Sequence, residues 1–127
     1  MTILIADDDR GLVLLLSKHF LKKGFEVMGA YDALQASHTA MRRTIDAVIL
    51  DLSMPDMDGI EVVRSIRREL PEIKVVVVSG FMEGVMLEVA GFLGADATLA
   101  KPANAQALLK TVCDVLCNSL RREATSD

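Results

Sequence analysis

The chain has 127 residues, of which 51% are hydrophobic, 25% charged and 4% aromatic, and its formal net charge is −4. This length suits one domain with a single core and is too short for two. The composition indicates a folded protein with an aliphatic core and argues against disorder. A net negative charge argues against a permanent nucleic-acid surface, which would be basic.

Targeting and membrane signals are absent from the sequence pattern. The apolar N-terminus is only a few residues long and runs into three aspartates, Asp7 to Asp9, where a signal peptide would stay apolar. The longest apolar stretch in a predicted helix, Leu12 to Leu16, is far too short for a membrane span. We therefore expect a cytoplasmic protein that does not contact a membrane.

Apolar runs of strand length alternate with amphipathic stretches of helix length along the chain. The pattern predicts strands at 2–6, 25–30, 46–50, 73–78 and 95–99, and helices at 10–22, 32–42, 58–70, 82–93 and 104–121. Five strand–helix repeats predict an α/β fold, doubly wound, with a parallel sheet and helices on both faces. The run Val75 to Val78 predicts a central strand that is buried on both sides.

Helix boundaries and helix faces carry their own signals. Gly24 is expected to end the first helix, Pro71 the third, and Asn104 to cap the last. Two capping boxes are predicted, Asp32 with Gln35 and Asp58 with Glu61. The last helix has a predicted core stripe of Leu109, Val112, Cys113, Leu116 and Leu120. Cys113 and Cys117 are four residues apart on this helix, which is poor geometry for a disulfide, so both are expected to be reduced.

Polar residues follow the predicted strands at their carboxyl ends, where open parallel sheets bind ligands. They are Asp7, Asp8 and Asp9 after the first strand, Asp51 after the third, Ser79 after the fourth and Lys101 after the fifth. Carboxylates brought together repel one another until they are protonated or meet a cation, and such oxygen ligands suit Mg²⁺. The lysine and the serine can contact phosphate oxygens. The set predicts phosphoryl transfer, with Asp51 as the candidate nucleophile.

The chain resembles the receiver domains of two-component response regulators over nearly its whole length. The resemblance rests on four motifs in order: residues 3–8 (ILIADD), 48–59 (VILDLSMPDMDG), 77–80 (VVSG), and 94–96 (GAD) leading to Lys101-Pro102. It implies a flavodoxin-like five-stranded sheet with strand order 2-1-3-4-5. It also implies that the chain takes a phosphoryl group from a sensor histidine kinase or a histidine phosphotransfer protein and then switches its binding of a downstream protein effector. Such a protein catalyses only its own phosphorylation and dephosphorylation.

The resemblance also implies a role for each matching residue. Asp51 would be the phosphoacceptor, Ser79 the switch hydroxyl and Lys101 the lysine that pairs with the phosphoryl group. The Mg²⁺ ligands would be Asp8, Asp51 and the main-chain carbonyl of Ser53, with Asp7 acting mostly through water. Asp9 is left with two possible roles, joining this cluster or capping the first helix.

Two positions depart from the family pattern. Thr98 stands where receivers usually carry an aromatic switch residue, and Ala103 stands where Phe is usual after the Lys-Pro pair. The ordinary coupling through an inward-turning ring therefore cannot operate in its usual form. We expect phosphorylation to rearrange residues 80–93 and to leave the fifth strand nearly still.

Two other readings stay open at this point. A small phosphatase of the haloacid-dehalogenase type also uses an aspartate nucleophile, but it would carry a second aspartate at the position of Ser53. A degenerate receiver would bind partners without accepting phosphate. We expect a receiver domain over 1–121 and a short tail over 122–127 without an output domain. Diffusible effector, phosphorelay shuttle and phosphate sink are equally compatible with that organisation.

Overall fold

The structure is a computed structural model that describes residues 1–54, 59–80, 88–91, 93–101 and 103–125, with side chains up to residue 118. Its sheet contains β1 (Thr2–Ala6), β2 (Glu26–Ala30), β3 (Ala47–Asp51), β4 (Lys74–Ser79) and β5 (Ala97–Ala100). The strand order is β2-β1-β3-β4-β5, and every neighbouring pair is parallel. The predicted fold class and strand order are confirmed.

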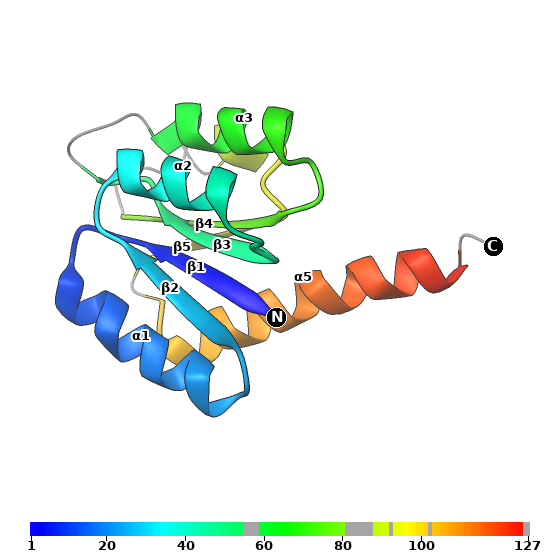
Figure 1. Cartoon of the computed structure of the whole chain (residues 1–127), viewed down its shortest axis with the longest axis horizontal. Coiled ribbons are helices and arrows are strands. Elements are labelled where there is room, and N and C mark those ends of the chain that lie inside the picture. Colours follow the sequence, from blue (N-terminus) through cyan, green and yellow to red (C-terminus); the bar gives the residue numbers. More distant parts are fainter. Residues whose placement is uncertain (55–58, 81–87, 92, 102, 126–127) are drawn as a thin grey trace.

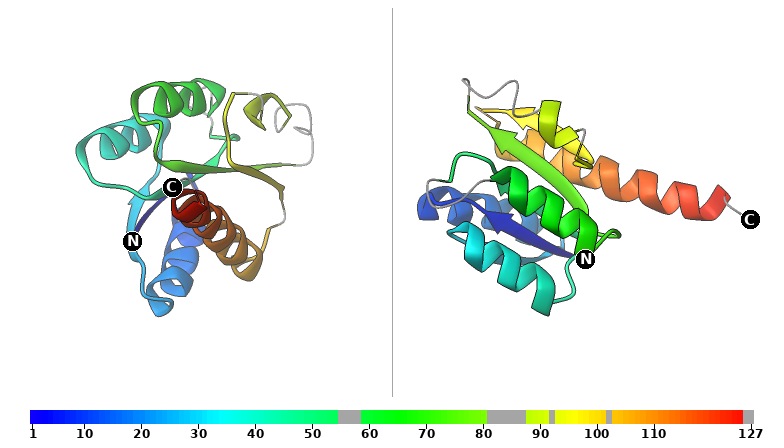
Figure 2. Two further views of the ribbon diagram at one scale, coloured as in Figure 1. Left: turned by 90° about the vertical axis from the view of Figure 1, so that its right-hand side faces the viewer. Right: turned by 90° about the horizontal axis from the view of Figure 1, so that it is seen from above.

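Helices cover both faces of this sheet (Figures 1 and 2). One face carries α1 (Arg10–Lys22) and α5 (Ala105–Thr125), and the other carries α2 (Ala33–Arg42) and α3 (Gly59–Glu69). Residues 88–91 are also helical, and Ala90 from this segment is buried with the α2–α3 side. The three-layer arrangement leaves the carboxyl ends of all the strands at one edge.

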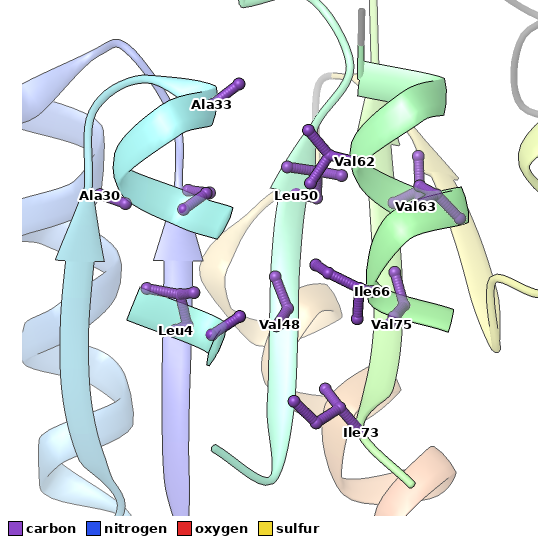
Figure 3. Packing of buried hydrophobic residues seen from close by; sticks show 14 of the residues in the cluster. Leu4, Ala30, Ala33, Val48, Leu50, Val62, Val63, Ile66, Ile73 and Val75 are labelled. Carbon is purple, nitrogen blue, oxygen red and sulfur yellow. The ribbon is translucent and has the colours of Figure 1, made fainter. Parts of the chain in front are cut away.

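Alternation along each strand divides the core into two clusters. Leu4, Val48, Leu50 and Val75 point toward α2 and α3, where they meet Val62, Val63 and Ile66 (Figure 3). Val77 belongs to the same cluster. Their neighbours along the same strands point the other way, against Val13, Leu16 and Phe20 of α1 and Leu108, Val112 and Leu116 of α5. Because successive side chains of a strand point to opposite faces, strands covered on both sides are apolar at every position. This explains the unbroken run Val75 to Val78.

The predicted helix signals are largely found in the structure. The side chains of Asp9, Asp32 and Asn104 accept hydrogen bonds from the backbone N–H groups of Leu12, Gln35 and Ala107 at 3.1, 2.7 and 2.7 Å. Gly24 follows α1 with a φ of 92°, a conformation that favours glycine. The Gln35 side chain accepts from the N–H of Tyr31, one residue before the cap, so this is not a strict capping box.

Some boundaries and one core residue were predicted wrongly. Helix α5 runs to Thr125, beyond the predicted end at residue 121, and β5 begins at Ala97 instead of residue 95. Cys113 is exposed and not part of the core, because it lies on the outer side of α5 while Val112 and Leu116 face the sheet. Cys117 is also exposed, and both cysteines are free, as expected.

Three predictions fall outside the described residues. These are the cap at Asp58, the side chain of Leu120, and most of the 80–93 segment that was expected to move on phosphorylation. Among the helices that are described, none combines the length and the apolar character of a membrane span.

Two helical glycines, Gly59 at the site edge and Gly91 away from it, provide a matched test of local packing. A Cβ added at Gly59, the first residue of α3, would lie 2.8 Å from Cδ2 and 2.9 Å from the Cα of Leu52. A Cβ at Gly91 would meet nothing within 4 Å. Gly59→Ala should therefore destabilise the protein by about 1–3 kcal/mol through overpacking against backbone. Gly91→Ala should stabilise it by about 0.4–1 kcal/mol, because alanine restricts the unfolded chain.

Urea denaturation of the two variants and the wild type would measure both effects. Equal midpoints for Gly59→Ala and the wild type would show that the Leu52 backbone gives way, contrary to this expectation.

Candidate functional site

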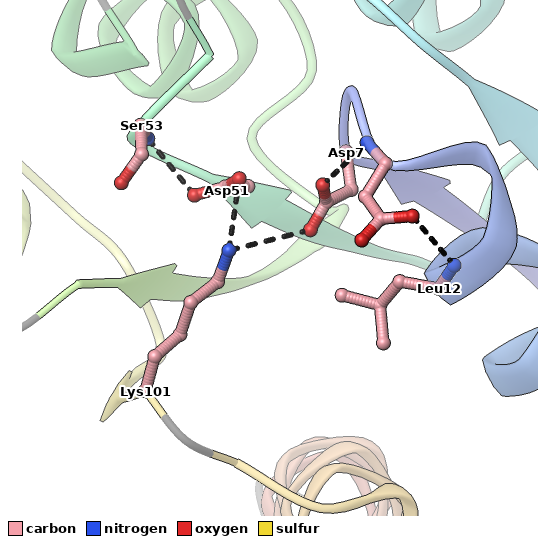
Figure 4. Close-up of polar contacts among 6 residues, drawn as sticks. Asp7, Leu12, Asp51, Ser53 and Lys101 are labelled. Atoms are coloured by element: carbon pink, nitrogen blue, oxygen red, sulfur yellow. Dashed lines mark hydrogen bonds and ion pairs between the residues drawn. The ribbon is translucent and has the colours of Figure 1, made fainter.

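Asp51 is the last residue of β3 and its side chain is almost fully buried, with a residue exposure of 2%. One carboxylate oxygen, Oδ1, accepts a hydrogen bond of 2.9 Å from the backbone N–H of Ser53. This contact is possible because the chain turns directly after the strand. The other oxygen, Oδ2, faces the carboxyl-end edge of the sheet, where it meets a lysine (Figure 4).

Asp7 follows β1 and is the second buried carboxylate at this edge, at 6% exposure. Its Oδ1 accepts a hydrogen bond of 2.9 Å from the N–H of Asp9. Asp8 is exposed, and the carboxylate of Asp9 is occupied at the start of α1 as its N-cap. The turn from β1 into α1 thus gives three consecutive aspartates three different environments. The structure confirms the capping role of Asp9.

Lys101 supplies the positive charge between the two buried carboxylates (Figure 4). Its Nζ lies 3.1 Å from Asp51 Oδ2 and 3.6 Å from Asp7 Oδ2. The main-chain N–H of Lys101 donates to the carbonyl of Ser79 at 2.7 Å, which continues the β4–β5 pairing and fixes where the side chain starts. Lys101 therefore starts at the end of β5 and reaches past β4 to the carboxylates at the ends of β3 and β1.

The pKa values at the site follow from this arrangement. Burial raises the pKa of Asp7, and the charges of Asp51 and Asp8 raise it further, while the Asp9 N–H and Lys101 act in the opposite direction. The net effect is a raised pKa for Asp7. Burial alone would lower the pKa of Lys101, but its hydrogen bond to Asp51 and the charges of Asp51 and Asp7 outweigh burial and raise it. Lys101 is thus held in its charged form.

Oxygens of Asp7, Asp8 and Asp51 lie within 4.8 Å of one another. Octahedral Mg²⁺ takes oxygen ligands at about 2.0–2.1 Å, so neighbouring ligand oxygens around one ion lie roughly 3 Å apart. The cluster's oxygens lie up to 4.8 Å apart, so the carboxylates would draw closer together around an ion, and one of them, Asp8, is open to solvent. Three carboxylates against one lysine also leave the site short of positive charge. The residues therefore fit a Mg²⁺ site.

Ser79 ends β4 and is fully buried. In the β3–β4 register Asp51 is paired with Val78, so Ser79 lies one residue farther toward the site edge on the neighbouring strand. Thr98 is exposed on β5, where it pairs with Val77. The sheet thus brings Asp7, Asp51, Ser79 and Lys101 to one edge, and leaves Thr98 two residues short of it.

Asp96, the last residue of the 94–96 motif, makes structural contacts and does not lie at the site. Its Oδ2 accepts hydrogen bonds of 2.8 Å from the N–H of Val75 and 2.8 Å from Arg67. The backbone N–H of Asp96 donates to the carbonyl of Val75 at 2.7 Å. These contacts tie the entry of β5 to the beginning of β4 and to α3. They lie at the opposite edge of the sheet from Asp51.

A cavity of about 480 Å³ adjoins the carboxylates, and sequence reasoning did not predict it. Asp7, Asp51 and Lys101 contribute to its lining, but most of its walls are apolar side chains from β1, β3, β4, α1 and α5. Ala103 is one of the lining residues. The only signal in the sequence was this alanine at a position where the resemblance implied a phenylalanine.

Residues 3–113 match the family model described as the response regulator receiver domain. The chain belongs to the response regulator receiver family. This receiver is 35% identical over 100 residues to sporulation initiation phosphotransferase F of Bacillus subtilis, covering 79% of the receiver and 81% of that relative. It is 37% identical over 101 residues to the transcriptional regulatory protein PrrA of Mycobacterium tuberculosis, of which it spans only 43%.

Solved receiver structures agree with the fold. A CheY-like receiver domain protein from Methanospirillum hungatei superposes with a TM-score of 0.90 at 26% identity, covering 95% of this chain and 97% of that one. The chemotaxis response regulator CheY4 of Vibrio cholerae gives a TM-score of 0.82 at 28% identity, covering 90% of this chain and 97% of that one. The predicted family and fold are both confirmed.

The raised pKa of Asp7 predicts the effect of removing its charge. Asp7→Asn should raise the Tm of the metal-free protein by a few degrees at pH 7, because the ionised carboxylate is buried beside Asp51 while an amide keeps an acceptor for the Asp9 N–H. A raised folded-state pKa means that the native state binds the proton more tightly than the unfolded state. Stability from this group therefore falls as pH rises from 3.8 through the raised pKa of Asp7.

Thermal unfolding in excess chelator between pH 3.5 and 8 would measure this effect, with Glu72→Gln as the control because Glu72 is exposed and lies away from the site. The advantage of Asp7→Asn should shrink toward acid pH. An advantage that is constant across the range would contradict the assignment.

Proposed function

We propose that this receiver accepts a phosphoryl group on Asp51, in a reaction that requires Mg²⁺, from the phosphohistidine of a sensor kinase or phosphotransfer protein. The observation that carries the proposal is the buried Asp51 carboxylate with one oxygen held by the Ser53 N–H and the other within 3.1 Å of Lys101. A carboxylate in this position has a fixed orientation and faces the open edge of the sheet. That is what a nucleophile needs for in-line attack.

Each residue of the site would have a separate role in phosphoryl transfer. An oxygen of Asp51 attacks phosphorus, the P–N bond to the donor histidine breaks, and its electron pair returns to the imidazole. The Ser53 N–H orients the attacking carboxylate. The Lys101 ammonium can then turn from the carboxylate to a phosphoryl oxygen and donate a charge-assisted hydrogen bond to it. Ser79, buried at the adjacent strand end, is the hydroxyl that would contact another phosphoryl oxygen.

Asp8, Asp51 and the main-chain carbonyl of Ser53 would be direct ligands of the Mg²⁺, and Asp7 would act through water. When bound, the ion supplies positive charge that neutralises the phosphoryl oxygens. The exposure of Asp8 and the burial of Asp7 support this division, because only Asp8 is free to adjust to an incoming ion.

A phosphatase of the haloacid-dehalogenase type is less well supported. Its acid–base step would need a carboxylic acid two residues after the nucleophile, and that residue is Ser53, whose side chain is exposed. The match to sporulation initiation phosphotransferase F over 81% of that relative supports phosphotransfer between proteins as the role of this chain. Phosphorylation would change the affinity of this chain for a protein partner.

Phosphorylation should require both Asp51 and a divalent cation. Incubation with phosphoramidate and Mg²⁺ should add about one phosphate per chain, measured by intact-protein mass spectrometry. Asp51→Asn should take up none, because the amide is not a nucleophile, and excess chelator should abolish uptake by the wild type. Equal uptake by Asp51→Asn, or undiminished uptake in chelator, would disprove the proposal.

The three neighbouring aspartates should differ in their effect on metal affinity. Asp8→Asn should weaken Mg²⁺ binding about tenfold, or ~1.4 kcal/mol, and more than Asp7→Asn does. Asp9→Asn is the matched control, because asparagine also caps helices and the Asp9 carboxylate is already committed to the Leu12 N–H. Isothermal titration with MgCl₂ would rank the three, and equal losses would show that Asp8 is not the direct ligand.

A further inference from the structure

The cavity beside Asp51 combines apolar walls with a charged side. The walls come from the sheet and from the two helices that cover this face of it: Leu12, Leu16, Ile49, Val78, Ala103 and Leu108. Among the described lining residues the charged ones are Asp7, Asp51 and Lys101, all at the carboxyl-end edge of the sheet. An apolar pocket with a few convergent charged groups is typical of a small-molecule binding site.

The volume of about 480 Å³ is enough for a ring that carries a short chain. An apolar cavity of roughly 150 Å³ already holds a benzene molecule. Ala103 contributes to this room, because its side chain ends at Cβ and a larger residue would occupy part of the cavity. Apolar walls in contact with water are unfavourable, so an apolar ligand that displaces the water gains free energy. The walls therefore favour a ligand with a compact apolar group.

The charged side of the cavity favours a cationic ligand. The Nζ atom of Lys101 already lies 3.1 Å from Asp51 Oδ2 and 3.6 Å from Asp7 Oδ2. An anion that approached Lys101 would therefore also approach both carboxylates, which repel it. A cation meets two carboxylates and one lysine. Because a carboxylate oxygen can accept more than one hydrogen bond, a ligand ammonium can donate to Asp7 or Asp51 without displacing Lys101.

We propose that this cavity binds a small primary amine that carries an aromatic or branched apolar group, and that the bound amine competes with Mg²⁺. The apolar group lies against the walls, and the ammonium lies beside the carboxylates of Asp7 and Asp51. Both cations neutralise the same acidic cluster, so the binding of one weakens the binding of the other.

The consequence for phosphorylation rests on the proposed function. If Asp51 takes up phosphate with the help of Mg²⁺, an amine that competes with the ion lowers the rate of uptake, and excess Mg²⁺ restores it. The binding of the amine does not depend on that reaction. The cavity would then let the concentration of a small metabolite amine control how readily this receiver is phosphorylated.

Four probes separate the contributions of ring and charge. They are 2-phenylethylamine, with both ring and positive charge; 2-phenylethanol, with the ring alone; 3-phenylpropionate, with the ring and a negative charge; and ethylamine, with the charge alone. In metal-free wild-type protein at pH 7, 2-phenylethylamine should bind with a Kd of about 1 mM or below. Each of the other three should bind at least about fivefold more weakly, because each lacks one of the two contacts.

Methyl resonances followed by NMR during the titration would locate the probe without any substitution. The methyl groups of Leu12, Ile49 and Leu108, which line the cavity, should shift on addition of 2-phenylethylamine. Those of Leu34 and Met41 should not, because both residues are exposed on α2, on the other face of the sheet. Equal shifts at the two sets of residues would show non-specific binding and overturn the proposal.

Two substitutions test the two halves of the cavity separately. Ala103→Phe should weaken the binding of 2-phenylethylamine about tenfold or more by filling the space. Gln106→Phe is the matched control, since Gln106 is exposed on α5 and does not line the cavity, and it should leave the Kd within about twofold. Asp51→Asn keeps the shape but removes a charge, so it should weaken the binding of the amine and leave that of 2-phenylethanol unchanged.

Competition is measured by titrating MgCl₂ into the protein with and without 2-phenylethylamine. The apparent Kd for Mg²⁺ should rise about threefold or more at near-saturating amine and stay unchanged with 2-phenylethanol. The proposal is overturned if 3-phenylpropionate or ethylamine binds as tightly as 2-phenylethylamine, if Ala103→Phe binds it as well as Gln106→Phe, or if the amine leaves the Mg²⁺ affinity unchanged. Failure of Asp51 to accept phosphate from phosphoramidate in the absence of any amine would instead refute the proposed function.

Discussion

The contact of Lys101 with two nearly buried carboxylates is the interaction on which the site depends. Asp51 and Asp7 both lose most of their hydration, and like charges so close together raise the cost of keeping both ionised. Lys101 offsets this cost from 3.1 and 3.6 Å, and it can do so only because β5 pairs in parallel with β4 and delivers the lysine to the same edge. The charge balance around Asp51 therefore depends on the pairing of β5 with β4.

The sequence predicts this framework well because the physical signals are strong and local. Strands that are buried on both faces appear as unbroken apolar runs, and side-chain caps such as Asp9 and Asn104 mark the start of helices. The weaker predictions concern amphipathic helix α5. Its spacing allowed Cys113 to join the core stripe, but only a narrow side of α5 contacts the sheet, and Cys113 lies about 100° around the helix from Val112.

The site residues could be located from the sequence, but their electrostatic states could not. Asp7, Asp8 and Asp9 are identical in chemistry and adjacent in the chain, and nothing in their order indicates which one is buried. The turn between β1 and α1 decides this, since it directs Asp7 inward toward Lys101, leaves Asp8 in solvent and uses Asp9 as a cap. Such differences arise from backbone direction over a few residues, which periodicity does not encode.

The cavity beside the carboxylates affects the electrostatics of the site. As long as it is open, water reaches the surroundings of Asp51 and screens the attraction between its carboxylate, Lys101 and an incoming phosphoryl group. Charges interact more strongly in a lower dielectric, so any group that filled the cavity and removed this water would strengthen the contact between Asp51 and Lys101. The strength of that contact therefore depends on the apolar walls beside it as well as on the distance between the two charged groups.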